Sequence, residues 1–391
     1  MERRRVAITG VGVVSPCGIG TEAFWDGLLA APPEGLRRVH DFDPAPLFDN
    51  AKEARRADRF TQFALAAASE ALAQSGPLQA DPSRIGTWIG TGIGGLTTLE
   101  EQVLVREHKG DRRVSPFMVP MLMANAASAA VSMRYGYQGP CETTCTACAA
   151  GTQSIGNAYR LISYGRCDAV VTGSSECTMT PTCIAGFTNM TAMSAEYLSR
   201  PFDRDRDGFV MGEGAGVLVL EELESARARG ATILGEVVGA ASNADAHHIT
   251  APSPGGTGAL ACMELALADA GLEPDQVAHV NAHGTSTPAN DAAEAEAIAK
   301  LFGADGPPVT SIKGVTGHSL GAAGSIEAVA VVLSIQKGLI PPTAGYVTPD
   351  PDMAPIDLVV GGPREWTPGP TLSNSFGFGG HNGCVVISPV S

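Results

Sequence analysis

The sequence predicts an α/β protein in which helices cover both faces of a sheet. Short apolar runs alternate along the chain with segments of helical periodicity. The 47 glycines and an aromatic fraction of only 5% indicate a core of small residues with close helix–strand packing. With 391 residues, 44% of them hydrophobic and 17% charged, the chain can bury a large core, which excludes wholesale disorder. No linker or low-complexity segment interrupts it, so we expect one compact unit of two halves, residues 1–235 and 236–391.

The first half begins with an apolar run at 6–9, which predicts a core strand. Residues 59–75 place Phe60, Phe63 and several alanines on one face of a helix, and Gly76-Pro77 terminates it. The remaining strands of this half are expected at 85–90, 169–172 and 217–220, and the remaining helices at 148–164 and from residue 222 onward.

The second half repeats the same alternation, starting from a strand at 233–242. Its helices are expected at 257–270, 289–302 and 321–337. Its further strands are expected at 277–281, 309–312, 356–360, 371–375 and 384–388. The repetition favours two halves of similar construction.

The charge and cysteine content narrow the class of protein. A net charge of −15 and a pI of about 4.9 disfavour nucleic acid as a partner. Nine cysteines, an odd number in a long chain, indicate reduced thiols rather than a disulfide framework. No run of about 18 apolar residues predicts a membrane span, and the basic start Arg3-Arg4-Arg5 precedes a run too short for a signal peptide. We therefore expect a cytoplasmic protein.

Two short motifs resemble ligand sites but lack a required residue. Gly10-Val11-Gly12 follows a strand, yet the third glycine of a dinucleotide loop is absent and no helix follows directly. The acidic run at 203–208 resembles a calcium loop, but Gly214 stands where the bidentate glutamate is needed. We expect an ion-paired turn there.

Cys148 has the sequence context of a nucleophile. It lies between an extended run and a helix, where the positive end of the helix dipole favours a thiolate. The small neighbours Ala147, Ala149 and Gly151 permit a sharp turn that leaves the sulfur open. The alternative is a buried structural cysteine, which suits the other eight.

Two histidines occupy strand-to-helix transitions, where open α/β folds place their sites. His283 follows an apolar strand, and His318 precedes a helix of small residues. A single histidine in such a place is more often structural, but two of them with Lys313, Glu327 and a turn cysteine favour a site. Zinc ligation is the alternative, although the spacings fit no zinc pattern.

A glycine-rich turn at 374–382 carries Phe376 and Phe378 near the C-terminus. Such a turn can move and can offer backbone N–H groups to an oxyanion. The alternative is a plain hairpin turn between two strands.

Together these segments resemble the β-ketoacyl-acyl carrier protein synthases of the condensing-enzyme, or thiolase-fold, superfamily. The resemblance covers essentially the whole chain and rests on long motifs in the right order. These are TACAAG around Cys148, SRPFDRDRDGFVMGEGAG at 199–216, VNAHGTSTPANDAAE at 280–294, KGVTGHSLGAAGSIE at 313–327 and NSFGFGGHN at 374–382. The family implies a five-layered α/β/α/β/α fold from two similar halves, and a dimer.

The resemblance implies an acyltransferase that extends fatty-acid or polyketide chains by decarboxylative Claisen condensation. The family's Cys-His-His set corresponds to Cys148, His283 and His318. Initiating synthases carry asparagine in place of His318, so the elongating branch is favoured. A thiolase acting on coenzyme A thioesters is less favoured, because Cys384 lies in an apolar strand rather than in a glycine-rich motif. Three further functions stay open: the ketosynthase subunit of a type II polyketide heterodimer, a non-catalytic partner subunit and a cysteine hydrolase.

Further residues receive roles only through the resemblance. Lys313, paired with Glu327 and Asp291, orients the histidines, and the backbone of Cys148 and Phe378 forms an oxyanion hole. Thr285 and Thr287 bind the phosphopantetheine arm, and Ile93 and Phe376 bind the substrate, with Ile93 in the acyl-pocket region. Phe117 corresponds to a region that faces the other subunit of the dimer. No cofactor and no catalytic metal are expected. Asn281, Glu327, Ser373 and Asn374 match a structural monovalent-cation site of some relatives.

The implied partner is an acyl carrier protein, which is acidic, so docking on this acidic chain needs a local basic patch. Lys52, Arg55, Arg56 and Arg59 have the spacing of one helical face, and Arg112-Arg113 form a second cluster. The alternative is a solvated charged face. The dimer is expected to be a homodimer or a pair with a homologue that resembles a chain-length factor.

Overall fold

The computed structural model describes residues 3–303 and 305–390, and a long mixed sheet organises them. Strand β2 (Gly18–Ile19) pairs with β1 and is not part of the main strand order. The main order is β4 (Cys141–Glu142), β3 (Ile85–Gly90), β5 (Ala169–Glu176), β6 (Gly214–Glu222), β1 (Val6–Ser15), β7 (Gly235–Ala244), β13 (His381–Ser388), β12 (Thr371–Gly377), β8 (His279–Asn281) and β9 (Val309–Thr310). The two half-sheets join where Val6–Ile8 of β1 pair with Gly235–Val237 of β7.

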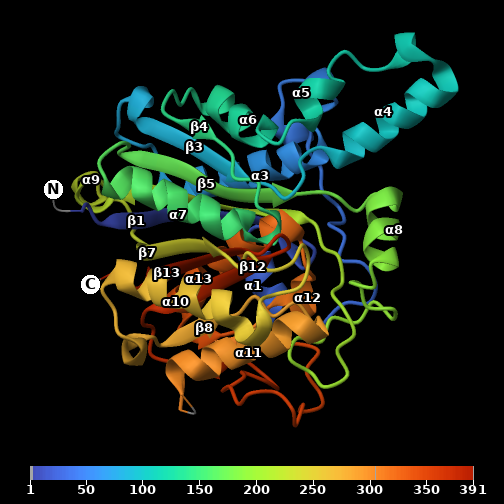
Figure 1. Cartoon of the computed structure of the whole chain (residues 1–391). Helices are drawn as coiled ribbons and strands as arrows, with labels where there is room; N and C mark the ends of the chain where they lie inside the picture. Colours follow the sequence, from blue (N-terminus) through green and yellow to red (C-terminus); the bar gives the residue numbers. More distant parts are fainter. Residues whose placement is uncertain (1–2, 304, 391) are drawn as a thin grey trace.

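Helices form three layers around the two half-sheets (Figure 1). Helices α3 (Arg59–Ser75) and α6 (Ala126–Tyr135) cover the outer face of the first half-sheet. Helices α10 (Thr257–Ala270) and α11 (Pro288–Phe302) cover the second. Between the half-sheets lie α7 (Ala150–Ser163) and α13 (Ala323–Lys337), each in contact with strands of both. This confirms the expected α/β/α/β/α order.

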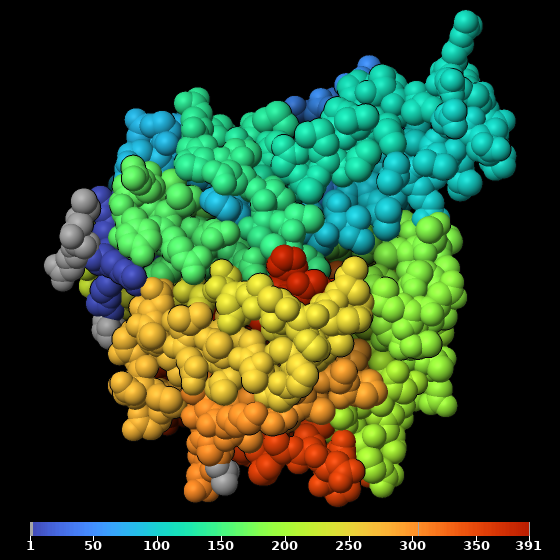
Figure 2. All heavy atoms as spheres, in the orientation of Figure 1, coloured from blue at the N-terminus to red at the C-terminus, as the bar shows by residue number. Residues whose placement is uncertain are grey.

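The remaining elements connect or extend these layers. They are α1 (Thr21–Leu28), α2 (Ala51–Ala54), α4 (Leu96–Lys109), α5 (Met118–Leu122), α8 (Pro181–Asn189), α9 (Leu223–Ala228), α12 (Lys313–Thr316), β10 (Leu339–Ile340) and β11 (Arg364–Glu365). Helices α4 and α5 form an arm that projects from the body (Figures 1 and 2). The arm exposes apolar side chains, among them Val103, Leu104, Val119 and Met123.

The central helix α13 is buried on all sides, because both its faces are covered. All its residues from Ala323 to Ile335 are buried. The stretch Leu320–Lys337 is long and apolar enough to meet the length and composition of a membrane span, yet 83% of it is buried inside the protein. Its high hydropathy is that of a core helix packed between two sheets.

Most predicted elements form, and three match in both bounds: 59–75, 85–90 and 257–270. The predicted strand at 356–360 is wrong, since Leu358 makes only an isolated bridge to Val309. Gly10 and Gly12 lie inside β1, where a Cβ on either would approach the carbonyl oxygens of α3 to within about 2 Å. These glycines therefore serve close helix–strand packing.

The acidic run at 203–208 forms the expected ion-paired turn. Arg206 pairs with Asp350 at 2.7 Å, and Arg200 pairs with Asp207 at 3.4 Å. One Asp203 oxygen accepts from the backbone N–H groups of residues 347 and 348, both at 2.6 Å. These contacts tie the turn to the chain near residue 348.

Candidate active site

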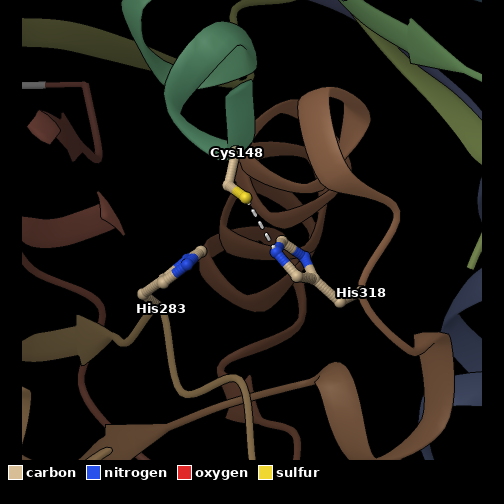
Figure 3. A group of neighbouring side chains, drawn as sticks. All are labelled: Cys148, His283 and His318. Carbon is tan, nitrogen blue, oxygen red and sulfur yellow. Dashed lines mark hydrogen bonds between the residues drawn. The ribbon is translucent and has the colours of Figure 1, made fainter. Parts of the chain in front are cut away.

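Cys148 lies in a tight turn at the start of the central helix α7. A 3₁₀ turn, Ala147–Ala149, precedes the helix, so the α-helix begins two residues later than predicted. Ala147 has a φ of 49°, a left-handed conformation that non-glycine residues adopt rarely and at a cost. The turn directs the Cys148 side chain toward the two histidines (Figure 3).

The structure brings Cys148, His283 and His318 together from three separate segments (Figure 3). The Nε2 atom of His318 lies 3.0 Å from the Cys148 sulfur. The two imidazole rings stand edge to face, with centroids 5.3 Å apart and planes at 83°. His283 lies two residues beyond the end of β8, and His318 lies between α12 and α13.

Burial determines the charge state of Cys148. It raises the pKa of the Cys148 thiol to about 11, and the hydrogen bond from the Phe378 backbone and the charge of Lys313 offset this only in part. The resting group at neutral pH is therefore a thiol. Burial therefore opposes the thiolate that the helix dipole favours, and the burial effect on the pKa is the larger one.

Both histidines are neutral in this environment. Burial and the charge of Lys313 hold the pKa of each, His283 and His318, well below the usual range. The Lys313 ammonium, which can only donate, lies 3.4 Å from Nδ1 of His283, so this nitrogen accepts and the ring proton is on Nε2. Neutral imidazoles of this kind can donate a hydrogen bond to a developing negative charge.

Lys313 lies behind His283 rather than in the cavity. Its ammonium donates to the His283 carbonyl at 2.5 Å and forms a buried ion pair with Glu327. The expected pairing with Asp291 is wrong. Asp291 instead accepts from the backbone N–H groups of Phe202, Thr285 and Ser286 and so shapes the loop after His283.

Replacing Lys313 by methionine is expected to destabilise the protein by about 3–5 kcal/mol, because it leaves the Glu327 carboxylate buried without its counter-charge. Urea unfolding measures this loss. The matched control is Lys300→Met, which breaks the half-exposed pair with Glu296 and should cost less than about 1 kcal/mol. Equal losses in the two variants would contradict a structural role for the buried pair.

Two backbone N–H groups converge on the Cys148 sulfur. They belong to Cys148 itself and to Phe378. Phe378 lies in the turn between β12 and β13, which pair antiparallel, so the glycine-rich segment is a hairpin that also supplies a donor. A Cβ at Gly377 would lie 3.1 Å from the Cys148 nitrogen and would crowd this donor pair.

A cavity of about 300 Å³ opens onto Cys148 and both histidines. Thr285 and Thr287 lie on its wall, with their hydroxyl oxygens 2.9 Å apart. Phe376 and Phe378 line it from the C-terminal hairpin. In Figure 2, a red C-terminal segment reaches the surface between the green and yellow parts of the chain.

Several predicted residues lie outside this cavity. Ile93 is 42% exposed and is not part of the cavity wall. Phe117 lies on the projecting arm, where the guanidinium of Arg56 stands 4.1 Å from its ring centre. Arg112 and Arg113 are exposed in a 3₁₀ turn of the same arm.

The expected single basic face at residues 52–59 is wrong. Helix α2 ends at Ala54 with Arg55 as its cap, and α3 begins only at Arg59. Arg59 turns inward, where it donates to the Val39 carbonyl at 2.8 Å and packs over the Phe63 ring. Arg55 and Arg56 stay exposed. The helix breaks because Asp58 caps α3 by accepting from the Phe60 N–H.

The three central side chains also have the donor types of a zinc site. Their ligand atoms lie within 4.8 Å of one another. A tetrahedral zinc would hold a sulfur and a nitrogen roughly 3.5 Å apart. The 3.0 Å between Cys148 and His318 fits a direct hydrogen bond instead. We therefore keep the prediction that the site works without a metal.

Two functional neighbours were missed by sequence reasoning. Phe209 stands edge to face against His318, with ring centroids 5.3 Å apart. Glu294 accepts from the backbone N–H groups of His283 and Gly284, both at 2.7 Å. Both residues lie in the long motifs noted above, but apolar and acidic residues in a motif carry no signal of which atom they contact.

Fold and site together define an acyltransferase of the condensing-enzyme class, with one cysteine and two histidines around one cavity. Two family models match the chain, Beta-ketoacyl synthase, N-terminal domain, at 31–226 and Beta-ketoacyl synthase, C-terminal domain, at 234–347. The chain belongs to the β-ketoacyl synthase family.

The similar proteins include a 3-oxoacyl-acyl carrier protein synthase and ketosynthases. The chain is 46% identical to the 3-oxoacyl-(acyl-carrier-protein) synthase 2 of Synechocystis sp., with 98% of this chain and 97% of that protein covered. The structure of the ishigamide ketosynthase/chain length factor matches with a TM-score of 0.94 and 33% identity, over 100% of both chains. A ketosynthase bound to a hexaketide, in complex with its type II polyketide acyl carrier protein, matches at 0.90 and 32%, over 99% of this chain and 100% of that one.

Proposed function

We propose that the protein extends an acyl chain by decarboxylative Claisen condensation with malonyl-acyl carrier protein, giving 3-ketoacyl-acyl carrier protein. One observation carries this proposal: a buried thiol, two neutral imidazoles and two backbone N–H groups converge on one cavity. A nucleophile, an oxyanion hole and a second pair of donors are what the two half-reactions need.

The first half-reaction transfers the acyl group to Cys148. The sulfur attacks the thioester carbonyl, and the N–H groups of Cys148 and Phe378 stabilise the oxyanion. The Cys148 proton passes to the departing carrier sulfur, so the step exchanges one thioester for another. His318 Nε2, 3.0 Å from the Cys148 sulfur, carries a proton throughout, which the second half-reaction uses.

The second half-reaction removes carbon dioxide from the malonyl thioester. The electron pair of the broken carbon–carbon bond forms an enolate, whose oxygen accepts hydrogen bonds from His283 and His318. Because the cavity is buried, such donors act in a low dielectric, where they stabilise charge strongly. The enolate carbon then attacks the acyl-Cys148 thioester, and the released sulfur takes up one proton. No redox or nucleotide cofactor is required.

Mass spectrometry of carrier-bound products tests the proposal. With acyl and malonyl carrier proteins together, we expect a 3-ketoacyl carrier protein and carbon dioxide. Product from acyl-coenzyme A alone, without carrier, would favour a thiolase, and free acid would favour a hydrolase. A thiolase would need a second catalytic cysteine. Cys384 does not fit that role, because its buried thiol donates to Asn374 at 3.2 Å and lies outside the cavity wall.

The pathway has two candidates, fatty-acid synthesis and a type II polyketide system. The Synechocystis relative supports the first, and the ishigamide neighbour supports a ketosynthase paired with a chain length factor. The apolar side chains exposed on the α4–α5 arm support a dimer in either case. Co-purification with a similar-sized homologue that lacks the cysteine would select the polyketide heterodimer. The intact Cys148 argues against a non-catalytic subunit.

An acyl carrier protein is the proposed partner, with docking on Arg55, Arg56, Arg112 and Arg113. Arg55→Glu is expected to raise the apparent KM for carrier-bound substrate, and the effect should shrink at high salt, because exposed charges are screened over about 8–10 Å. Steady-state kinetics over a salt series measures this. Arg55→Glu is preferred to Arg56→Glu, since Arg56 also packs on Phe117.

The control for this prediction is Arg166→Glu, a charge reversal at another exposed arginine, beyond the end of α7. It should leave the apparent KM unchanged. An unchanged KM in Arg55→Glu at low salt, or an equal change in both variants, would remove Arg55 from the docking surface.

We also propose a structural monovalent cation held by Asn281, Glu327, Ser373 and Asn374. All four are buried, and Oε2 of Glu327 has no hydrogen-bond partner among the described residues. That oxygen fits a cation, which would balance the negative charge of Glu327 together with Lys313. The cation would take no part in the reaction. A cytoplasmic location is proposed from the acidic composition and the free cysteines.

A further inference from the structure

A buried carboxylate near the site has no role in the reaction described above. Glu176 is the last residue of β5 and is completely buried. Its Oε2 accepts from the backbone N–H of Gly92 at 2.6 Å and from that of Gly321 at 3.1 Å. Its Oε1 accepts from the Thr91 hydroxyl at 3.3 Å. One carboxylate oxygen therefore joins two loops that are 229 residues apart in the sequence.

The first of these loops is attached to the segment that carries Cys148. The Thr91 N–H donates to the Thr144 carbonyl at 3.0 Å. The thiol of Cys145, three residues before the nucleophile, donates to the Gly92 carbonyl at 3.2 Å. These two hydrogen bonds tie the loop after β3 to the segment that leads into the Cys148 turn.

The second loop is the turn that follows His318. Leu320–Ala322 form a 3₁₀ turn two residues beyond His318, and Leu320 has a φ of 46°. Leu320 lines the cavity and packs in the same apolar cluster as Cys148. The position of this turn therefore influences where the His318 ring lies relative to the sulfur.

The two loops approach closely, so the contact needs an acceptor between them. An ideal Cβ on Gly321 would lie only 2.1 Å from the Gly92 nitrogen. Without Glu176, the half-buried N–H of Gly92 and the buried N–H of Gly321 would face each other with no acceptor between them, which is unfavourable. Burial raises the pKa of Glu176 to about 7, opposed by the hydrogen bonds from Gly92 and Gly321. The carboxyl oxygen accepts both N–H groups in either charge state.

We propose that Glu176 is a positioning residue that sets the distance between His318 and Cys148 by clamping the 320–322 turn to the 91–94 loop. It touches neither substrate nor reacting atoms. The inference rests on the proposed function, in which His318 stabilises the enolate.

Two substitutions separate the span of this side chain from its charge. In Glu176→Gln, the amide oxygen keeps the reach to both N–H groups and the amide NH₂ faces the Thr91 hydroxyl, so malonyl decarboxylation should stay within about threefold of wild type. In Glu176→Asp, the charge stays but the side chain is one methylene too short. Decarboxylation should then fall by about 10- to 100-fold, since a displacement of about 1 Å can cost that much.

Acyl loading of Cys148 is the second readout. It depends on the nucleophile and its own oxyanion donors, so in Glu176→Asp it should change by less than about threefold. The matched control is Glu221→Ala, which removes a buried, hydrogen-bonded carboxylate at the opposite end of the β5–β6 ladder. This variant should lose stability but decarboxylate normally per folded molecule.

The outcomes are distinct. The clamp is supported if Glu176→Gln stays active and Glu176→Asp loses decarboxylation but keeps acyl loading. Asp active and Gln impaired would overturn it, as would wild-type decarboxylation in both variants or an equal loss in Glu221→Ala. If the wild-type protein itself releases no carbon dioxide from malonyl carrier protein, the proposed function fails first.

Discussion

His283→Ala and His318→Ala are each expected to lower carbon dioxide release from malonyl carrier protein by about 10²–10³-fold, the usual effect of losing one oxyanion donor. The reason is geometric, because both neutral rings face the cavity and can donate to the same enolate oxygen. Each variant should still accept some acyl group on Cys148, since the donors at that oxyanion are backbone N–H groups. Radiometric carbon dioxide release and intact mass measure the two steps separately.

The control for the histidine variants is His279→Ala. His279 is also buried, and it lies four residues before His283, but neither of its ring nitrogens has a hydrogen-bond partner among the described residues and it is not part of the cavity wall. Its loss should affect stability rather than decarboxylation per folded molecule. Wild-type decarboxylation by both site variants would show that the histidines have another role.

Cys148→Ala is expected to abolish condensation while decarboxylation survives, because the enolate is stabilised by the histidines and not by the sulfur. Alanine suits a helix start, and the change removes a single sulfur, so the fold should be retained. Cys148→Gln should decarboxylate faster than unacylated wild type, because its neutral carbonyl beside the N–H groups of Cys148 and Phe378 imitates the acylated state. Carbon dioxide release from malonyl carrier protein measures both variants.

Cys145→Ala is the matched control for the cysteine variants. Cys145 is an exposed thiol three residues before the nucleophile and donates to the Gly92 carbonyl. Its loss should leave both condensation and decarboxylation close to wild type. A Cys148→Ala variant that still condenses, or a Cys148→Gln variant slower than wild type, would contradict the two-step scheme.

The elements and the central residues were predictable because their signals are local. Helices such as 59–75 and 257–270 carry an apolar face and a terminating glycine within their own sequence. Cys148 and His283 each stand at a strand–helix transition, as predicted, whereas His318 stands between α12 and α13; all three meet where the half-sheets enclose the central helices. The long motifs around these three residues then assigned them to one catalytic set, through the resemblance to a known family.

What escaped prediction depends on contacts between distant segments. The resting thiol of Cys148 follows from burial that only the folded chain creates. The Lys313–Glu327 pair was predicted, but Asp291, expected to pair with Lys313 as well, accepts from backbone N–H groups instead. The basic residues at 52–59 have helical spacing, but a cap at Asp58 starts a new helix. Glu176 is an acidic residue in an apolar strand, and nothing local indicates the two loops it joins.

Locating the acyl group on the protein tests whether Cys148 is the nucleophile. Wild type and Cys148→Ala would be exposed to acyl carrier protein, and intact mass with peptide mapping would follow. We expect a single acyl adduct in wild type, on the peptide that contains Cys148, and none in Cys148→Ala. An adduct that persists in Cys148→Ala, at Cys145 or elsewhere, would contradict the nucleophile and with it the proposed reaction.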